Sequence, residues 1–497
     1  MKLYANTTRT IGRRDPMIYG HFLEHFHRQV YDGVYCPGSP LADEDGFRTD
    51  VIDAMKKIRV PVLRWPGGCF VSSYHWKDAV GPNREPTFDI SWRVEDPNTF
   101  GTDEYVKFCR KVGCEPYICT NAGTGDAEEM SDWVQYCNLK NEGKLAKWRI
   151  ANGCEEPHNV KYWSIGNENW GEHEIGAKSS EEWGRLVLES AKMMLRADPT
   201  IELSAAALTD IDWNINLLRK ARTRLKWVSI HDYWDWIQTT NDFADYNQSM
   251  AYTADLESGI RKVRGLLMAL GMEKHIRIAF DEWNLRGWYH PNIHTMIPAA
   301  AKEDYLYPRD KNDINSLYTM ADAVFSACFL NTCLRNCDIV GMANFAPIVN
   351  TRGCIFTHPE GIVLRSTYHI FDLYVNYLGD TVLDTWTEEL PKMTVTHRRG
   401  WNVSVDAVDL VATSWSDKPG IAVAAVNKEP EKEHTVTLNF DCEGREVRVF
   451  TVAGNSPESY NDIGHEEIKI EESEPVPYVR GMEISLRPHS ANVIQIL

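Results

Sequence analysis

Two glutamates indicate the chemistry that this sequence can perform. Glu168 lies in Ser164-Ile-Gly-Asn-Glu-Asn169 and Glu282 lies in Phe280-Asp-Glu-Trp-Asn284, each at the end of a short apolar run. A single glutamate in such a place is more often a helix cap or an ion-pair partner than a catalyst. Two carboxyl groups about 5 Å apart, however, can hydrolyse a glycosidic bond by double displacement. The pair therefore predicts a retaining glycoside hydrolase.

The residues expected near the two glutamates assign their roles. Asn167, next to Glu168, can hydrogen-bond a sugar hydroxyl close to the anomeric carbon. Tyr233 can orient the carboxylate of the nucleophile, and the positive charge of Arg64 can keep one carboxylate ionised. The acid must hold a proton near neutral pH, so we expect burial and a neighbouring negative charge to raise its pKa. We therefore assign Glu168 as acid/base and Glu282 as nucleophile.

The elements that position these residues follow from hydrophobic patterning. Eight nearly continuous apolar runs are typical of parallel strands buried on both faces: Met17–Glu24, Val60–Gly68, Glu115–Gly123, Tyr162–Asn169, Ile201–Leu208, Trp227–Tyr233, Ile276–Asn284 and Ile339–Pro347. Amphipathic helical patterns lie between them, most clearly at Asp50–Arg59, Glu181–Ala197, Tyr252–Leu270 and Asp313–Asn336. This alternation predicts an α/β fold, a (β/α)8 TIM barrel, with a doubly wound sheet as the alternative.

Polar groups end five of the eight predicted strands. They are found in His21–His25, Arg64–Cys69, Asn167–Asn169, His231–Tyr233 and Asp281–Trp283. The C-terminal ends of barrel strands meet at one rim, where the catalytic groups of such enzymes lie. We therefore expect these five segments to form a single site.

A second region begins after about Gly379, where the helical pattern ends. Short alternating runs such as Gly420–Val426 and Glu446–Val452 are separated by turn residues, which is typical of an all-β sandwich. A further strand around Lys2–Ala5 precedes the barrel and can pair into that sandwich. We expect a catalytic barrel at residues 12–379 and a jelly-roll-like β-sandwich made of residues 1–11 plus 380–497.

Composition narrows the classes of partner. The net charge of −18 disfavours binding to nucleic acid and to anionic membranes. The sequence contains no run of eighteen apolar residues, the pattern that would predict a membrane span. The N-terminal segment Met1–Thr10 has no apolar core of a secretory signal, so we expect a cytoplasmic protein. The twelve cysteines match no zinc spacing and are expected to be free thiols. We expect no metal site and no cofactor.

Four motifs together resemble glycoside hydrolase family 51, the α-L-arabinofuranosidases. They are Gly20-His-Phe-Leu-Glu-His25, Arg64-Trp-Pro-Gly-Gly-Cys69, Tyr162-Trp-Ser-Ile-Gly-Asn-Glu-Asn-Trp-Gly171 and Asp281-Glu-Trp283. The resemblance implies a barrel with a β-sandwich, and a retaining mechanism on the same two glutamates. It also implies a homo-oligomer, often a hexamer.

The resemblance implies a sugar pocket as well. Glu24, Asn167 and Tyr233 match the pocket residues of the family, and Trp92 matches an aromatic residue on a loop near the pocket mouth. Trp288 matches an aromatic residue of the pocket wall beyond the nucleophile. Ordinary packing in the core is the alternative for both tryptophans.

Two departures from the family pattern concern substrate contacts. Cys69 stands where many members carry asparagine, and a thiol is a weaker hydrogen-bond donor. The stretch Pro347–His358 lacks a glutamine found there in many members. Asn350, Arg352 or His358 are then the candidates for substitute contacts.

The leading interpretation is an exo-acting α-L-arabinofuranosidase that releases terminal arabinofuranose from arabinoxylan or arabinan oligosaccharides. A β-xylosidase or a β-1,4-glucan hydrolase would use the same two carboxylates on another sugar. A carbohydrate-binding barrel without activity is the non-enzyme alternative, and the presence of both Glu168 and Glu282 argues against it.

Overall fold

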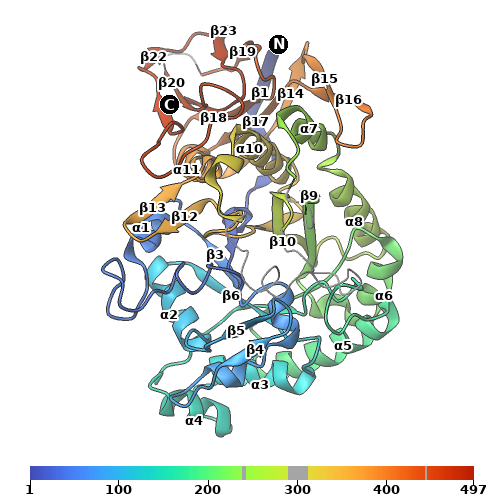
Figure 1. The fold of residues 1–497 in the computed structure, drawn as a ribbon. Helices are drawn as coiled ribbons and strands as arrows, with labels where there is room; N and C mark the ends of the chain where they lie inside the picture. Colours follow the sequence, from blue (N-terminus) through green and yellow to red (C-terminus); the bar gives the residue numbers. More distant parts are fainter. Residues whose placement is uncertain (238–241, 289–311, 443–444) are drawn as a thin grey trace.

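The computed structural model describes residues 1–237, 242–288, 312–442 and 445–497. Its larger part is built on eight parallel strands, which occupy the middle and lower half of Figure 1. They are β2 (Gly20–Phe22), β3 (Val62–Trp65), β6 (Glu115–Thr120), β7 (Tyr162–Ile165), β8 (Glu202–Ala205), β9 (Trp227–Asp235), β10 (Arg277–Arg286) and β11 (Val340–Phe345).

These strands close into a ring. Strands that follow one another along the chain pair in parallel from β2 to β8 and from β9 to β11, and β11 pairs with β2. Bridges between Leu203 and Leu225 and between Ala206 and Ser229 link the β8 segment to the β9 segment. The closed order confirms the predicted barrel and excludes the doubly wound sheet.

The first predicted strand is shorter than expected. Residues Pro16–Tyr19 form a 3-10 helix, and only Gly20–Phe22 pair as β2. The Asp15 side chain accepts a hydrogen bond from the Met17 amide, and Pro16 occupies the first helical turn, where a missing amide hydrogen costs nothing. Local capping thus overrides the apolar pattern at the start of this segment.

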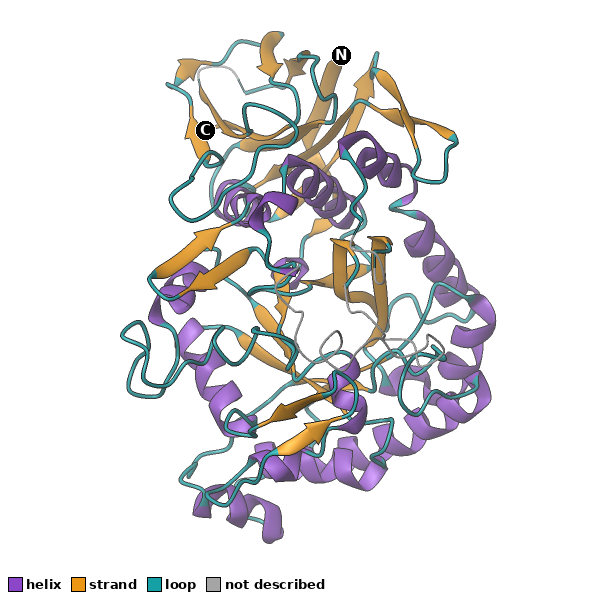
Figure 2. Ribbon diagram, in the orientation of Figure 1, coloured by secondary structure: helices purple, strands orange, loops and turns teal. Residues whose placement is uncertain are grey.

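Helices surround the barrel, as Figure 2 shows. They are α1 (Thr49–Lys57), α2 (Thr102–Val112), α3 (Ala127–Asn138), α4 (Gly143–Ala151), α5 (Ser180–Ala197), α6 (Ile211–Ala221), α7 (Tyr246–Ala251), α8 (Ser258–Ala269), α10 (Met320–Arg335) and α11 (Ser366–Tyr377). Two predicted helices begin later than expected. Tyr252–Asp255 is a separate 3-10 turn before α8, and α10 starts only after a capping box formed by Thr319 and Asp322.

The second region contains one hydrogen-bonded sheet of ten strands and a separate antiparallel pair, β15 (Lys392–Thr396) and β16 (Asn402–Asp406). The ten strands of the large sheet are β1 (Lys2–Arg13), β14 (Thr381–Glu388), β17 (Val408–Ser414), β18 (Ile421–Asn427), β19 (His434–Asn439), β20 (Glu446–Val452), β21 (Ile470–Glu472), β22 (Val476–Pro477), β23 (Met482–Leu486) and β24 (Ser490–Ile496). The N-terminal β1 pairs antiparallel with β14 and parallel with β19, which confirms the predicted pairing of the two chain ends. The division at residues 11/12 and 379/380 stays a prediction.

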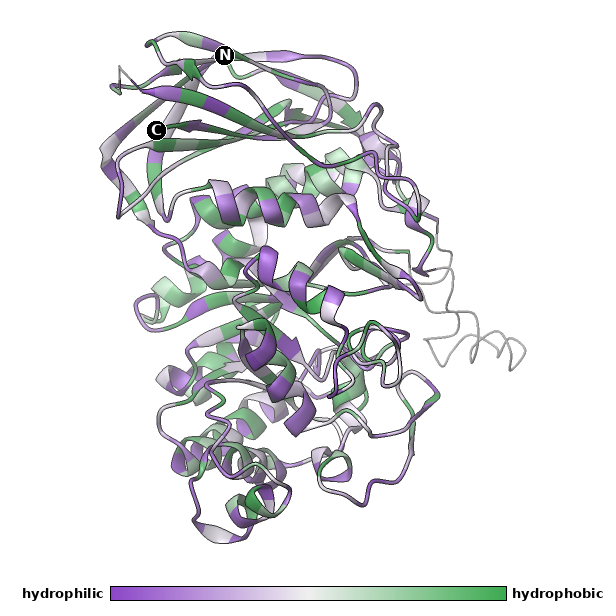
Figure 3. Ribbon diagram, turned by 90° about the vertical axis from the view of Figure 1, so that its left-hand side faces the viewer, coloured by the Kyte–Doolittle hydropathy of each residue, from purple (hydrophilic) through white to green (hydrophobic). Residues whose placement is uncertain are grey.

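The two regions share a packed layer of helices. In Figure 3 helices lie flat beneath the strands of the second region. Helix α10 contacts β17, β18 and β24 on one side and β10 and β11 on the other, and α11 contacts β20 and β24. Every residue of α10 from Met320 to Leu334 is therefore buried. No helix in the described ranges is both long and apolar enough to cross a membrane.

Candidate active site

The predicted site residues meet at the C-terminal ends of the barrel strands. One pocket is lined by eight of the nine: Glu24, Cys69, Trp92, Asn167, Glu168, Tyr233, Glu282 and Trp288. The ninth, Arg64, is fully buried in β3 below the pocket and contacts two of its members. Strand ends far apart in sequence thus supply one site, as the barrel geometry requires.

Glu282 is held by two fixed donors. Arg64 Nη1 donates to its Oε1 at 2.6 Å, and the Tyr233 hydroxyl donates to its Oε2 at 2.8 Å. The guanidinium stays charged at every pH relevant to an enzyme, so this partner never switches off. Only 5% of the Glu282 side chain is exposed, which fixes both carboxylate oxygens in one orientation.

Glu168 has different partners, because two histidines contact it. His231 Nδ1 lies 2.8 Å from its Oε1, and His173 Nε2 lies 2.7 Å from its Oε2. Burial alone would raise the pKa of Glu168, but the hydrogen bonds and charges of the two imidazoles outweigh it and lower that pKa. The expected upward shift is therefore wrong for the free protein, since cations rather than a second carboxylate contact this residue.

His231 connects the two glutamates. Its backbone pairs with Glu282 across β9 and β10, and its Nδ1 lies 3.6 Å from Glu282 Oε1. Burial would lower the pKa of His231, but Glu282, Asp281 and Glu168 together raise it to about 10. One ring nitrogen of His231, one carboxylate oxygen of Glu168 and one carboxylate oxygen of Glu282 all lie within 4.8 Å of one another. The two carboxylates are thus close enough to act on one glycosidic bond.

Glu24 lies on the floor of the pocket, where it is 2% exposed. It accepts hydrogen bonds from the Phe70 amide and from Trp92 Nε1, both at 3.1 Å. Burial, followed by the charge of Glu282, raises the pKa of Glu24. Gly68 is needed beside it, because a Cβ there would lie 3.2 Å from Glu282 Oε1 and 3.3 Å from Glu24 Oε1.

Glu174, which was not predicted from the sequence, lies beside both Cys69 and Asn167. Asn167 accepts from Arg64 Nη2 at 3.0 Å, and its amide lies 3.4 Å from Glu174 Oε2. Burial and the charges of Glu174 and Glu168 raise the pKa of the Cys69 thiol, so it is neutral near pH 7. Glu174 itself accepts a hydrogen bond from the Ser72 hydroxyl.

Aromatic side chains form the pocket wall. Trp288 packs edge-on against Phe26 and Tyr233 and is 9% exposed. Trp236 also lines the pocket but is 62% exposed, so it presents a free ring at the pocket mouth. Sequence analysis missed Trp236 and His173. The histidine lies in the polar run Glu172–Glu174, shortly after Glu168 in the sequence. This position was a signal from which a contact between His173 and Glu168 could have been predicted.

The residues proposed after the eighth strand do not reach the pocket. The lining residues of the described structure include none of Asn350, Arg352 and His358. Asn350 is fully buried and donates to the Arg28 carbonyl at 2.6 Å and to the Thr357 hydroxyl at 2.8 Å. Its side chain is committed to holding the loop, so the suggested substitute contacts are not made by this residue.

Two family models match the chain. Residues 54–252 match the alpha-L-arabinofuranosidase 1 domain, and residues 281–490 match the alpha-L-arabinofuranosidase C-terminal domain. An intracellular exo-alpha-(1->5)-L-arabinofuranosidase from Acetivibrio thermocellus is 32% identical, with 98% of this chain and 97% of the relative covered.

Solved structures agree over the whole length. The arabinose complex of an alpha-L-arabinofuranosidase from Thermotoga maritima superimposes with a TM-score of 0.88 at 32% identity, covering all of both chains. A thermostable GH51 alpha-L-arabinofuranosidase from Thermotoga petrophila has a TM-score of 0.86, also at 32% identity and complete coverage. With the paired glutamates at the rim of its barrel, this chain belongs to glycoside hydrolase family 51, the α-L-arabinofuranosidases.

Proposed function

We propose that the protein is a retaining, exo-acting α-L-arabinofuranosidase that releases terminal arabinofuranose from arabinoxylan or arabinan oligosaccharides. The observation that carries this proposal is the pair of glutamates with different partners, Glu168 and Glu282, which each place a carboxylate oxygen within 4.8 Å of the other. That spacing suits a covalent glycosyl-enzyme better than an inverting reaction, which needs room for a water molecule between the carboxyls. Membership of the α-L-arabinofuranosidase family supports arabinofuranose as the sugar that is released.

In the first step Glu282 attacks the anomeric carbon while Glu168 protonates the departing glycosidic oxygen. Arg64 and Tyr233 hold the Glu282 carboxylate in place for attack. In the second step Glu168 removes a proton from water, and the water displaces Glu282 from the sugar. One sugar carbon is thus inverted twice, and its configuration is retained.

The first step requires a proton on Glu168, although His173 and His231 favour its ionised form in the free protein. His173 is the more accessible of the two, with 26% of its side chain exposed against 4% for His231. A bound sugar that separates Glu168 from His173 would remove one of the two stabilising contacts. Binding and protonation of Glu168 are therefore coupled in this proposal.

The protein's surroundings are part of the proposal. Relatives from Acetivibrio thermocellus and Halalkalibacterium halodurans carry the word intracellular in their names. We propose that this protein also acts in the cytoplasm, on imported oligosaccharides, and that it does so as a homo-oligomer. Light scattering on the purified protein measures the number of subunits directly.

Comparing aryl α-L-arabinofuranoside with aryl β-D-xyloside tests the choice of sugar. We expect kcat/KM for the arabinofuranoside to be at least about 100-fold higher, because a site that hydrogen-bonds the hydroxyls of one sugar discriminates against a sugar that cannot make those bonds. A preference for the xyloside, or for a glucan oligosaccharide, would contradict the proposal and indicate a β-xylosidase or a β-1,4-glucan hydrolase instead. Product analysis with branched arabino-oligosaccharides then gives the linkage and tests the exo mode.

A further inference from the structure

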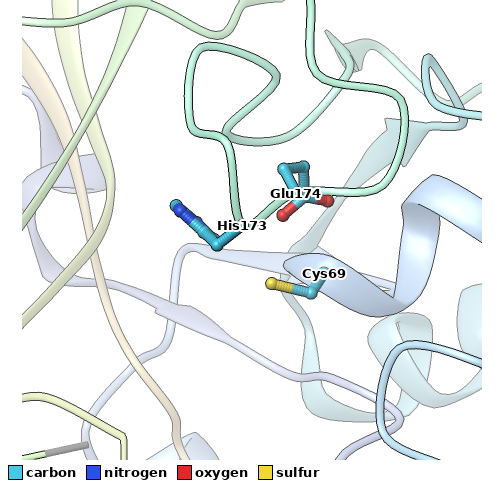
Figure 4. Close-up of side chains that lie close together, drawn as sticks. All are labelled: Cys69, His173 and Glu174. Atoms are coloured by element: carbon cyan, nitrogen blue, oxygen red, sulfur yellow. The ribbon is translucent and has the colours of Figure 1, made fainter. Parts of the chain in front are cut away.

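We propose that Cys69, His173 and Glu174 form a binding site for a soft divalent cation such as Zn²⁺, and that this cation inhibits the enzyme. Figure 4 shows the three side chains: His173 and Glu174 belong to the loop after β7, and Cys69 is the first residue of a 3-10 helix (Cys69–Ser73) after β3. Thiolate, imidazole and carboxylate are the ligands that zinc prefers in proteins. Only the inhibitory part of the inference rests on the proposed function.

The spacing of the three side chains is close to that of a filled site. Their ligand atoms lie within 4.8 Å of one another. Zinc bonds of about 2.0 to 2.3 Å in a tetrahedron place ligand atoms about 3.3 to 3.7 Å apart. Side-chain rotations that move the ligand atoms by about 1 Å would therefore bring them to the separations of a zinc site. Three protein ligands leave a fourth position open, as in zinc sites that exchange water or bind small molecules.

The outer contacts of a metal site are already in place. A ligating histidine almost always donates its second ring N–H to a carboxylate or carbonyl. His173 Nε2 lies 2.7 Å from Glu168 Oε2, and because a carboxylate only accepts, Nε2 carries a hydrogen, so a metal would bond to Nδ1 in place of the second proton of the imidazolium. Glu174 is likewise oriented by Ser72 and Asn167. This preorganisation is the second reason to assign a cation here.

The local charge also favours a cation. The carboxyl groups of Glu24 and Glu168 line the pocket together with Cys69, and Glu174 lies beside it, which gives the site a negative field. The same negative field attracts a divalent ion. On binding, the thiol of Cys69 and the imidazolium of His173 each release one proton to solvent, and the thiolate and the freed ring nitrogen bond to the metal, as metal binding to cysteine and histidine requires.

A cation at this place would block the proposed reaction in two ways. Cys69 and His173 line the pocket with both catalytic glutamates, so the ion would occupy space that the sugar needs. A metal-bound His173 would also keep its Nε2–H directed at Glu168, which would hold that residue as a carboxylate and prevent it from donating a proton. Inhibition should therefore be competitive with the sugar.

A second cluster of similar composition serves as an internal control. Asp103, Cys154 and His158 also bring ligand atoms within 4.8 Å of one another. There, however, His158 Nε2 is bonded directly to Asp103 at 2.8 Å, and the Tyr136 hydroxyl donates to the same carboxylate. The acid and the imidazole of that cluster satisfy each other, so we assign no cation to it.

Titration of the purified protein with Co²⁺ tests the binding site independently of activity. We expect a thiolate-to-cobalt charge-transfer band that saturates at one equivalent and is displaced by Zn²⁺. Cys69→Ser should abolish the band, His173→Asn should weaken cobalt binding at least about 10-fold, and Cys154→Ser should leave both unchanged. Absence of the band in the wild-type protein, or its loss in Cys154→Ser with retention in Cys69→Ser, would overturn the assignment.

Zinc inhibition of aryl arabinofuranoside hydrolysis tests the second part. We expect Zn²⁺ to raise KM, a chelator to restore it, and Cys69→Ser to need at least about 10-fold more zinc. If cobalt binds at Cys69 but zinc leaves hydrolysis unchanged, the inhibitory role is overturned while the cation site stands. A protein that binds cobalt but hydrolyses no arabinofuranoside would instead contradict the proposed function.

Discussion

The two sides of the pocket hold their carboxylates in different ways. Glu282 is bonded to a buried guanidinium and a phenol, at 2.6 and 2.8 Å. Glu168 is bonded to two imidazoles, at 2.7 and 2.8 Å. A guanidinium does not titrate in the working range of an enzyme, whereas a partly exposed imidazole such as that of His173 is a titratable partner.

This difference supports the proposed roles better than the two glutamates alone do. A nucleophile must be held in one orientation, which Arg64 and Tyr233 ensure for the Glu282 carboxylate. An acid/base must gain and lose a proton in each cycle, which requires partners whose contacts or charges can change. His173, with 26% of its side chain exposed, is such a partner for Glu168, whereas the buried His231 has a pKa raised to about 10 and stays charged.

Removing the nucleophile gives the largest expected effect. Glu282→Ala should lower kcat on the order of 10⁴-fold or more, because the covalent intermediate can no longer form. Azide should restore part of the turnover and give a product of inverted configuration, detectable by NMR. Substantial residual activity without azide rescue would remove Glu282 from this role.

Removing the acid should give a smaller effect that depends on the substrate. Glu168→Ala should slow hydrolysis of poor leaving groups about 10² to 10⁴-fold, because general acid catalysis contributes that much. Bond cleavage with a very good leaving group needs little protonation and should be nearly spared. Pre-steady-state release of a series of substituted phenols measures this dependence; an equal loss across the series would exclude Glu168 as the acid.

The titrating side should also give the fold a pH-dependent stability. The pKa of His231 is raised from 6.5 to about 10, so its contribution is complete below its unfolded-state pKa and is lost as pH rises through 10. His231→Asn should therefore cost at most about 5 kcal/mol of unfolding free energy at low pH, and less as pH rises. Urea titrations of both proteins at several pH values measure the difference, and a constant difference would contradict the assigned charge.

The smallest effect is expected from the phenol beside the nucleophile. Tyr233→Phe removes one hydrogen bond to a charged group, which is worth about 1.5 to 3 kcal/mol. We expect kcat/KM to fall about 10 to 100-fold, with little change in leaving-group dependence. Steady-state kinetics check this, and an effect like that of Glu168→Ala would show that the two sides of the pocket are not separate.

Sequence predicted the barrel and the two glutamates because both depend on local patterns. Apolar runs mark strands buried on both faces, and the parallel arrangement brings their polar ends to one rim. Pairing of the N-terminal strand into the second region was also predicted, whereas its partners β14 and β19 were identified only by the structure.

The partners of Glu168 could not be predicted in the same way. His173 lies in a loop, and loop geometry sets its contact with Glu168 rather than any repeating pattern. For this reason the expected rise in the pKa of Glu168 was wrong. Cys69 and Glu174 are distant in sequence and meet only through the barrel, so the spacing rules for metal sites could not find them.

Mapping the covalent intermediate tests the central claim most directly. The Glu168→Ala variant, given an aryl arabinofuranoside with a very good leaving group, should accumulate the glycosyl-enzyme because it lacks the base for the second step. Mass spectrometry of the digested protein should find one arabinofuranosyl group on the peptide that contains Glu282. A label on any other residue, or an inverted product formed without a covalent intermediate, would contradict the account.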